Sequence, residues 1–301
     1  MPIPLTTFDQ ADQVPSGQYY YSGSAVWSPI RLVVDSAIKS DFREFQLTYR
    51  QPLATINSAT AIQMLISGEV AFAQSIRSLN EVEIQNSQQR GSELQQIPIA
   101  YDGIAVSVHP SLSISGLTFT QLAQIYCGRV TNWKDFGGPD LEIQPISIER
   151  DSGEMVDRFA SQILKFRPFG QNLAFFSNAT DAIGYLAETP GGILFGSAAT
   201  MVPQCSIKPI SIGRESEKLI PPYQEPLIEP SRCPEQRNQI NAQAFQSQQY
   251  PLTQQLYVLF KSYPHNEYQA GQTYTKLLLS DQGQKLVTRA GFAPIKHTHF
   301  R

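Results

Sequence analysis

The sequence predicts an α/β fold, because strand-like and helix-like segments alternate along nearly all of its 301 residues. Hydrophobic residues make up 41% of the chain, which is ordinary for a globular protein. The length is sufficient for two packed lobes or for one large domain. These observations leave the number of lobes open.

The first third of the chain switches repeatedly between the helical and the strand period of apolar residues. Helical spacing is found at 29–39 and 58–67, and strand patterns at 45–49 and 70–73. Pro29 suits a first helical turn. Ser58 is expected to be the N-cap of the second helix, which Gly68 ends.

One strand region is unusually long. Residues 97–108 alternate over twelve positions and are broken around Asp102-Gly103. We interpret this run as a strand of sufficient length to pass from one lobe to another.

The remaining segments continue the alternation. We expect helices at 118–127, 180–188, 266–279 and 280–290, and strands at 141–148, 193–196 and 250–261. Ser152 is expected to cap a further helix that carries Met155, Phe159 and Ile163 on one face. Residues 213–247 are rich in Pro, Gln and Glu with weak periodicity, which predicts a long surface excursion.

Charge and hydropathy exclude several classes of partner. The net charge is −3 and no basic run occurs, so we expect no nucleic-acid partner. No stretch of 18 apolar residues is present to span a membrane. The first 13 residues have neither the basic start nor the apolar core of a signal peptide, so we expect either a cytosolic protein or a mature extracytoplasmic one.

The chain contains three cysteines, Cys127, Cys205 and Cys233, and no CxxC motif. The four histidines lack metal-site spacing with them, so we expect no metal and no cofactor. Cys205 and Cys233 flank a Pro-rich segment and form either a disulfide in an oxidising compartment or two free thiols. Cys127 falls on the apolar face of a predicted helix and is expected in the core.

Catalytic motifs such as G-x-S-x-G, the P-loop, G-x-G-x-x-G and H-E-x-x-H do not occur in the chain. Instead, Ser24, Ser58 and the Ser152-Gly153 pair stand where helices are expected to begin. A helix N-terminus presents free N–H groups that bind oxyanions, but serine also caps helices without any ligand. The residues alone leave both readings open.

Several segments closely resemble the phosphate-binding proteins of bacterial phosphate ABC importers. The block GRVTNWKDFGGPDL at 128–141 is the most specific of them. The segments that carry the resemblance are 97–110, 117–147, Ser152-Gly153, 250–261 and 277–295, with a looser fit at 66–79. It therefore extends over nearly the whole chain in the same order.

The resemblance implies a two-lobed, type II periplasmic-binding-protein-like fold with the ligand in the cleft between lobes. The crossings between lobes are expected near 101–106 and 245–253. The implied lobes are 1–102 plus 248–301 for lobe one and 103–247 for lobe two. It further implies a monomeric, non-enzymatic receptor in the periplasm or another extracytoplasmic space, which binds inorganic phosphate or a related oxyanion and delivers it to an ABC permease in the membrane.

The resemblance also implies that ligand groups come from four places in the chain. They are Ser24 and Ala25, then Ser58, then Ser75 and Arg77, and last Arg150, Ser152, Gly153 and Glu154.

This chain departs from the family pattern at the last of these places. Ile148 stands at the usual position of an arginine, and Glu154 replaces a threonine. A carboxylate aimed into a desolvated anion site repels the anion. Glu154 could instead turn outward, and Arg150 could replace the displaced arginine. The alternative function is accordingly a divergent binding or sensing protein with a changed or lost ligand.

Overall fold

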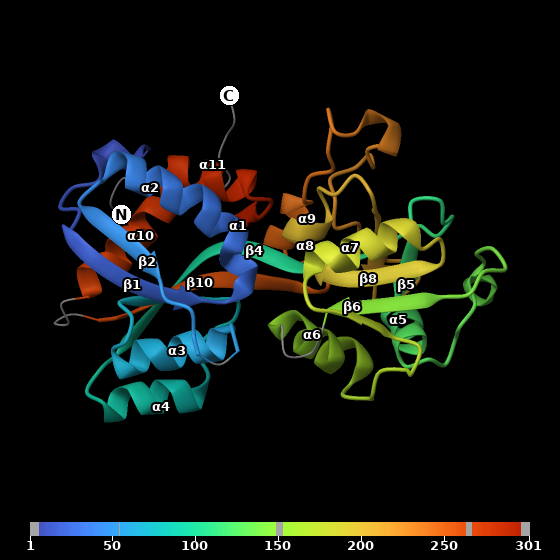
Figure 1. The fold of residues 1–301 in the computed structure, drawn as a ribbon, viewed down its shortest axis with the longest axis horizontal. Helices are drawn as coiled ribbons and strands as arrows, with labels where there is room; N and C mark the ends of the chain where they lie inside the picture. The colour runs from blue at the N-terminus through green and yellow to red at the C-terminus, as the bar shows by residue number, and fades with distance from the viewer. Residues whose placement is uncertain (1–5, 54, 149–152, 263–266, 296–301) are drawn as a thin grey trace. The chain divides into compact units, whose positions relative to one another are not determined.

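The computed structural model describes residues 6–53, 55–148, 153–262 and 267–295. The chain divides into two compact units, one of Met1–Tyr101 with Gln254–Arg301 and one of Asp102–Thr253. We call them unit 1 and unit 2. The chain leaves unit 1 within the long strand β4 (Leu94–Val108) and returns to it at the start of β10 (Thr253–Lys261) (Figure 1). The mixed α/β architecture predicted from the alternating pattern is confirmed.

The sheet of unit 1 has the strand order β2-β1-β3-β10-β4. Its other strands are β1 (Gly17–Gly23), β2 (Phe45–Tyr49), β3 (Phe72–Ser75) and the short β11 (Ala293–Pro294), which pairs with β4. Strand β1 runs parallel to both β2 and β3, whereas β10 is antiparallel to β3. Gly23 lies opposite Gln74 in the register, so β1 and β3 end at the same edge of the sheet.

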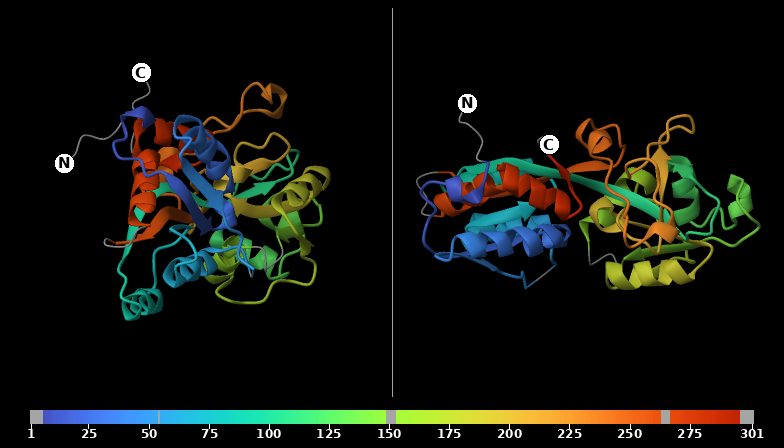
Figure 2. Two further views of the ribbon diagram at one scale, coloured as in Figure 1. Left: turned by 60° about the vertical axis from the view of Figure 1, so that its left-hand side comes forward. Right: turned by 90° about the horizontal axis from the view of Figure 1, so that it is seen from above.

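Helices cover both faces of this sheet (Figure 1). One face carries α3 (Ser58–Ser67) and α4 (Glu81–Gln89). The other carries α1 (Ser28–Ile30), a π-helical turn (Arg31–Asp35), α2 (Ser36–Asp41), α10 (Tyr268–Leu279) and α11 (Asp281–Arg289). Helices α10 and α11 pack side by side (Figure 2).

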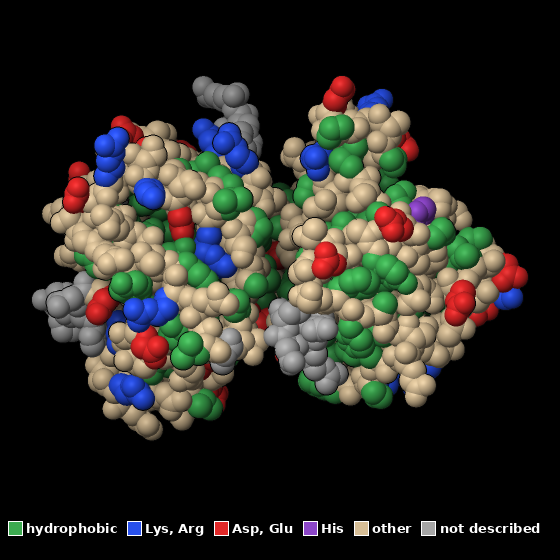
Figure 3. Space-filling view, viewed as in Figure 1, with side chains coloured by type: hydrophobic (Ala, Val, Ile, Leu, Met, Phe, Trp, Pro, Cys, Tyr) green, Lys and Arg blue, Asp and Glu red, His purple; other side chains and the backbone are tan. Residues whose placement is uncertain are grey.

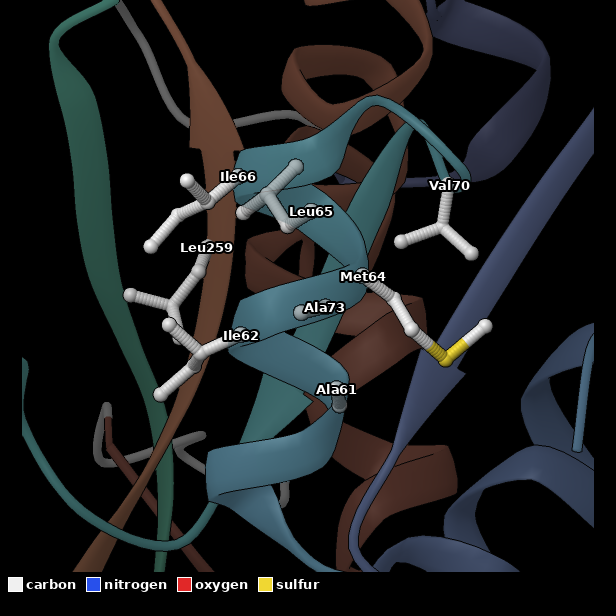
Figure 4. Close-up of a cluster of buried hydrophobic side chains, with 8 residues drawn as sticks. All are labelled: Ala61, Ile62, Met64, Leu65, Ile66, Val70, Ala73 and Leu259. Atoms are coloured by element: carbon white, nitrogen blue, oxygen red, sulfur yellow. The ribbon is translucent and has the colours of Figure 1, made fainter. Parts of the chain in front are cut away.

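The apolar side of α3 forms a core against the sheet (Figure 4). Its spacing at positions 61, 62, 65 and 66 places one helix face on β3 and β10, as the sequence pattern predicts. Burying these side chains fixes the start of α3 relative to the end of β3. The cluster consists of Ala61, Ile62, Met64, Leu65, Ile66, Val70, Ala73 and Leu259.

Unit 2 is built around β8 (Gly192–Ser197), which is antiparallel to β4 and parallel to β6 (Gln144–Ile148). Strand β7 (Ala174–Phe176) extends the sheet beyond β6. Strand β9 (Lys208–Gly213) pairs with β4 and with β5 (Gly116–Thr118).

An aromatic core joins the helices of unit 2 to β8. Tyr126 packs edge-on against Phe159 and Phe195, and the last two rings stack with centroids 3.8 Å apart. This packing places α5 and α6 on one face of the sheet. The helices are α5 (Phe119–Tyr126), α6 (Glu154–Phe159) with a π-helical turn (Ala160–Leu164), α7 (Ala179–Glu188), α8 (Ala198–Met201) and α9 (Ala242–Gln246).

The predicted long excursion is confirmed, because no extended strand is assigned among residues 214–252, all of which the structure describes. A disulfide joins Cys205 to Cys233 across a sequence separation of 28 residues and ties the excursion to the end of α8. Of the two possibilities left open by the sequence, the structure has the disulfide. Cys127 is free and only half-buried, because it lies one residue past the end of α5, so its expected core position was wrong.

The structure corrects the expected start of α3. Asn57 is the N-cap, and its side chain accepts a hydrogen bond of 2.8 Å from the Thr60 N–H. Ser58 is the first residue of the helix and is fully buried. The expected Ser152 cap of α6 lies outside the described residues, and Gly153 occupies the N-cap position there.

Candidate functional site

Three buried serines gather where β1 and β3 of unit 1 end. Ser24 follows β1, and its N–H donates to the Gln74 carbonyl at 3.0 Å. Ser75 is the last residue of β3, and its carbonyl accepts a bond of 3.1 Å from the Trp27 indole. Because both strands are parallel and adjacent, their carboxyl ends form one edge, which is the usual place of ligand sites in α/β sheets.

The third serine brings the N-terminus of α3 to this edge. The Ser58 hydroxyl accepts a hydrogen bond of 3.0 Å from the Ile76 N–H, directly after β3. Ser58 thereby joins two segments 18 residues apart. The structure thus brings Ser24, Ser58 and Ser75 to the same edge of the sheet.

The three serine hydroxyls differ in whether their protons are already donated to an acceptor within the protein. Ser75 both donates to the Arg77 carbonyl and accepts from the Arg77 N–H, so its hydroxyl is satisfied locally. Ser24 and Ser58 each accept one backbone N–H, from Val26 and Ile76 respectively. Within the described part of the chain, neither of these two hydroxyl protons has an acceptor. Two buried O–H donors therefore remain for a ligand oxygen.

The other two expected groups of unit 1 are less directly placed. Ala25 begins a 3-10 turn after Ser24, and its side chain is exposed. The Arg77 guanidinium forms a bidentate pair with Glu83, with N–O distances of 2.6 and 2.9 Å. This pairing neutralises most of the charge that Arg77 would bring to an anion.

In unit 2, Gly153 is the N-cap of α6 and has an extended backbone. Glu154 follows and is half-buried, and its Oε2 atom is buried without a hydrogen-bond partner among the residues that the structure describes. Arg150 and Ser152 lie outside the described residues. A buried carboxylate oxygen without a hydrogen-bond partner favours a ligand that can donate a hydrogen bond to it.

Sequence reasoning missed a buried aspartate at the start of unit 2. Asp102 is fully buried and accepts hydrogen bonds from the Ser197 hydroxyl at 2.7 Å and the Ala199 N–H at 3.1 Å. Burial raises the pKa of Asp102 to about 6, although these hydrogen bonds act in the opposite direction. The break in the strand pattern at Asp102-Gly103 was the available signal.

A second missed group lies in unit 1. Asp35 accepts hydrogen bonds from the hydroxyls of Tyr21 and Tyr274, the latter at 2.9 Å. Burial raises the pKa of Asp35 to about 6. The partners are 14 and 239 residues away in sequence, so no local pattern indicates this contact.

The described residues contain no group of three or more His, Cys, Asp or Glu side chains that could hold a metal ion. In the same part of the chain, no helix is long and apolar enough to cross a membrane. On the face shown in Figure 3, the described Lys and Arg side chains are interspersed with acidic ones. At the strand ends of unit 1, the hydroxyl groups of Ser24 and Ser58 are available to donate hydrogen bonds.

Two α/β units joined by two passages of the chain, with hydroxyl donors at the strand ends of one, are typical of solute-binding proteins. The chain belongs to the PBP superfamily, whose domain model matches residues 15–282.

Similar proteins are found among sequences and structures. The chain is 22% identical to phosphate-binding protein PstS of Staphylococcus epidermidis, over 92% of this chain and 79% of that protein. It is 24% identical to PstS of Pseudomonas aeruginosa, over 79% and 72% respectively. The fold matches a Clostridium perfringens protein crystallised with bound phosphate, with a TM-score of 0.70, 22% identity and coverage of 93% and 100%. A phosphate transport receptor from Vibrio cholerae matches with a TM-score of 0.69, 22% identity and coverage of 91% and 98%.

Proposed function

We propose that this protein is the extracytoplasmic receptor of an ABC importer and binds inorganic phosphate. The observation that carries the proposal is the pair of buried hydroxyls, Ser24 and Ser58, which keep a proton to donate at the strand ends of unit 1. A desolvated oxyanion is held well by such fixed neutral donors, because each one stabilises negative charge without moving. The relatives named as phosphate-binding proteins support the same ligand.

The proposal extends to the other residues that the resemblance implies as ligand groups. They are Ala25, Ser75 and Arg77 in unit 1, and Arg150, Ser152, Gly153 and Glu154 in unit 2. The proposed lobes are those that the resemblance implies, 1–102 plus 248–301 for lobe one and 103–247 for lobe two. The receptor acts as a monomer and delivers phosphate to a membrane permease without chemical conversion.

Calorimetric titration with phosphate, arsenate and sulfate tests the proposal. We expect a dissociation constant for phosphate of about 1 µM or lower. Ser58→Ala removes one buried donor and is expected to weaken phosphate binding at least about tenfold, since hydrogen bonds to charged groups contribute about 1.5–3 kcal/mol. Ser67→Ala is the matched control, because Ser67 lies at the exposed end of the same helix.

Absence of heat with all three anions would contradict the proposal. Equal loss in Ser58→Ala and Ser67→Ala would show that the site lies elsewhere.

The unpaired Glu154 Oε2 favours one alternative, a receptor of the same fold whose ligand has changed. A changed ligand predicts that Glu154→Thr confers phosphate binding on a protein that had none. Tight phosphate binding by the unmodified protein excludes this alternative.

A further inference from the structure

We propose that Arg31 is the cation that makes the unit 1 site attractive to an oxyanion. The inference rests on the proposed phosphate function and deepens it by naming the residue that supplies the charge. Neither the helix pattern at 29–39 nor the resemblance assigns a ligand role to Arg31.

The Arg31 guanidinium binds the backbone after β1 and a side chain of β3. Its Nη1 atom donates to the Ser24 carbonyl at 3.1 Å and to Gln74 Oε1 at 2.9 Å. Its Nη2 atom donates to Ser28 Oγ at 2.8 Å. The positive charge is therefore bonded to the backbone of Ser24, whose hydroxyl proton has no acceptor among the described residues.

An aromatic ring fixes the other side of the guanidinium. The Arg31 Cζ atom lies 4.3 Å from the centroid of the Tyr49 ring. The Tyr49 hydroxyl in turn donates to the Gly23 carbonyl at 2.9 Å. Tyr49 thus bonds the Gly23 carbonyl and Arg31 bonds the Ser24 carbonyl, so the two side chains hold the backbone on both sides of Ser24.

The charge of Arg31 is not consumed by an ion pair. All of its hydrogen-bond acceptors are neutral, and the ion pairs found within the described ranges are Arg77–Glu83 and Lys134–Asp140. Arg31 lowers the pKa of Asp35 electrostatically, but the two side chains form no ion pair among the described residues, and the Asp35 carboxylate accepts its hydrogen bonds from two tyrosine hydroxyls. A half-buried arginine held by neutral groups keeps most of its attraction for an anion.

Arg31 can therefore perform the role that the resemblance gives to Arg77, which Glu83 neutralises. Its positive charge attracts the anion, and its hydrogen bonds fix the backbone turn at Ser24. These two effects are separable, because lysine keeps the charge but loses the planar fork that bonds Ser24, Gln74 and Ser28.

The test measures phosphate affinity from about 20 to 500 mM salt for the wild type, Arg31→Gln and Arg31→Lys. We expect Arg31→Gln to lose about tenfold or more in affinity at low salt and to flatten the salt dependence, because screening acts on the charge. We expect Arg31→Lys to keep the wild-type salt dependence. A purely structural role would weaken both variants and leave the salt dependence unchanged.

Arg50→Gln is the matched control. Arg50 also lies over a tyrosine ring, Tyr20 at 4.2 Å, and donates to a carbonyl, that of Glu69 at 3.0 Å. The Arg50→Gln substitution removes one positive charge from the same unit without changing a contact to Ser24 or Gln74, so we expect little change in phosphate affinity.

The outcomes separate the two proposals. If the wild type binds phosphate and Arg31→Gln behaves as Arg50→Gln does, the inference about Arg31 is wrong while the function stands. If the wild type binds no phosphate, the proposed function fails, and the inference fails with it. Thermal unfolding of each variant identifies misfolding, and Arg31→Lys keeps the test decisive if Arg31→Gln does not fold.

Discussion

A single carboxylate oxygen is the most informative atom of unit 2 for ligand selectivity. The Glu154 carboxylate repels an oxyanion, but its unpaired Oε2 can accept a hydrogen bond from the P–OH group of phosphate, whereas sulfate has no O–H to donate at neutral pH. We predict that Glu154→Gln raises sulfate affinity more than phosphate affinity. The phosphate-to-sulfate ratio of dissociation constants, measured by calorimetry at pH 7, is expected to change about tenfold or more.

Asp157→Asn provides the comparison for this selectivity experiment. Asp157 is exposed on the first turn of the same helix, so its loss changes the helix charge without changing the buried oxygen. An unchanged ratio in Glu154→Gln, or the same change in both variants, would place Glu154 outside the site.

At the same scale, the sequence identified the serines but not how they are used. Ser24 and Ser58 were predicted from their places at helix starts and from the resemblance, and Ser75 from the resemblance alone. Their remaining hydrogen-bonding capacity could not be predicted, because it depends on partners such as the Ile76 N–H. The same holds for the arginines: only the folded chain brings Glu83 to Arg77 and Gln74 to Arg31.

At the scale of elements, segments with a clear apolar period were predicted and others were missed. The helix at 58–67 was predicted over its full observed length, because its apolar face is continuous and Gly68 adopts the left-handed conformation that ends it. Strand β1 was missed because its run of three tyrosines, Tyr19–Tyr21, does not alternate. Strands β5 and β7 have three residues each, too few to show a period.

Close packing of α10 on β10 predicts an unusual response to a helix-favouring substitution. A Cβ atom at Gly271 would lie 2.4 Å from the Phe260 Cβ, so Gly271→Ala forces the helix away from the strand. We expect a loss of about 1–3 kcal/mol in the free energy of unfolding, measured by urea denaturation.

Gly184→Ala in α7 is the matched substitution. A Cβ there meets no atom within 4 Å, so only the helix propensity changes, and we expect a gain of about 0.5–1 kcal/mol. If Gly271→Ala stabilised the protein as Gly184→Ala does, the close approach of α10 and β10 would be disproved.

At the scale of the whole molecule, the described part of each unit contains an aspartate with a raised pKa, the half-buried Asp35 in unit 1 and the fully buried Asp102 in unit 2. Burial opposes the charged form in both, and the pKa of each rises from 3.8 to about 6. Between these values the folded protein binds more protons than the unfolded chain. The free energy of unfolding must therefore increase as the pH falls through about 6.

We predict that each unit gains stability on acidification from pH 7 to pH 5, by about 1–3 kcal/mol. This window lies above the range in which ordinary exposed carboxyl groups titrate, so Asp35 and Asp102 dominate the carboxyl titration within it. Denaturant unfolding at half-unit pH steps measures the slope, and Asp35→Asn is expected to flatten it for unit 1 because the titrating group is gone. Glu69→Gln, which removes an exposed carboxylate from the same unit, should leave the slope unchanged. A wild-type stability that stays constant or decreases between pH 7 and pH 5 would show that both aspartates remain ionised in the folded protein.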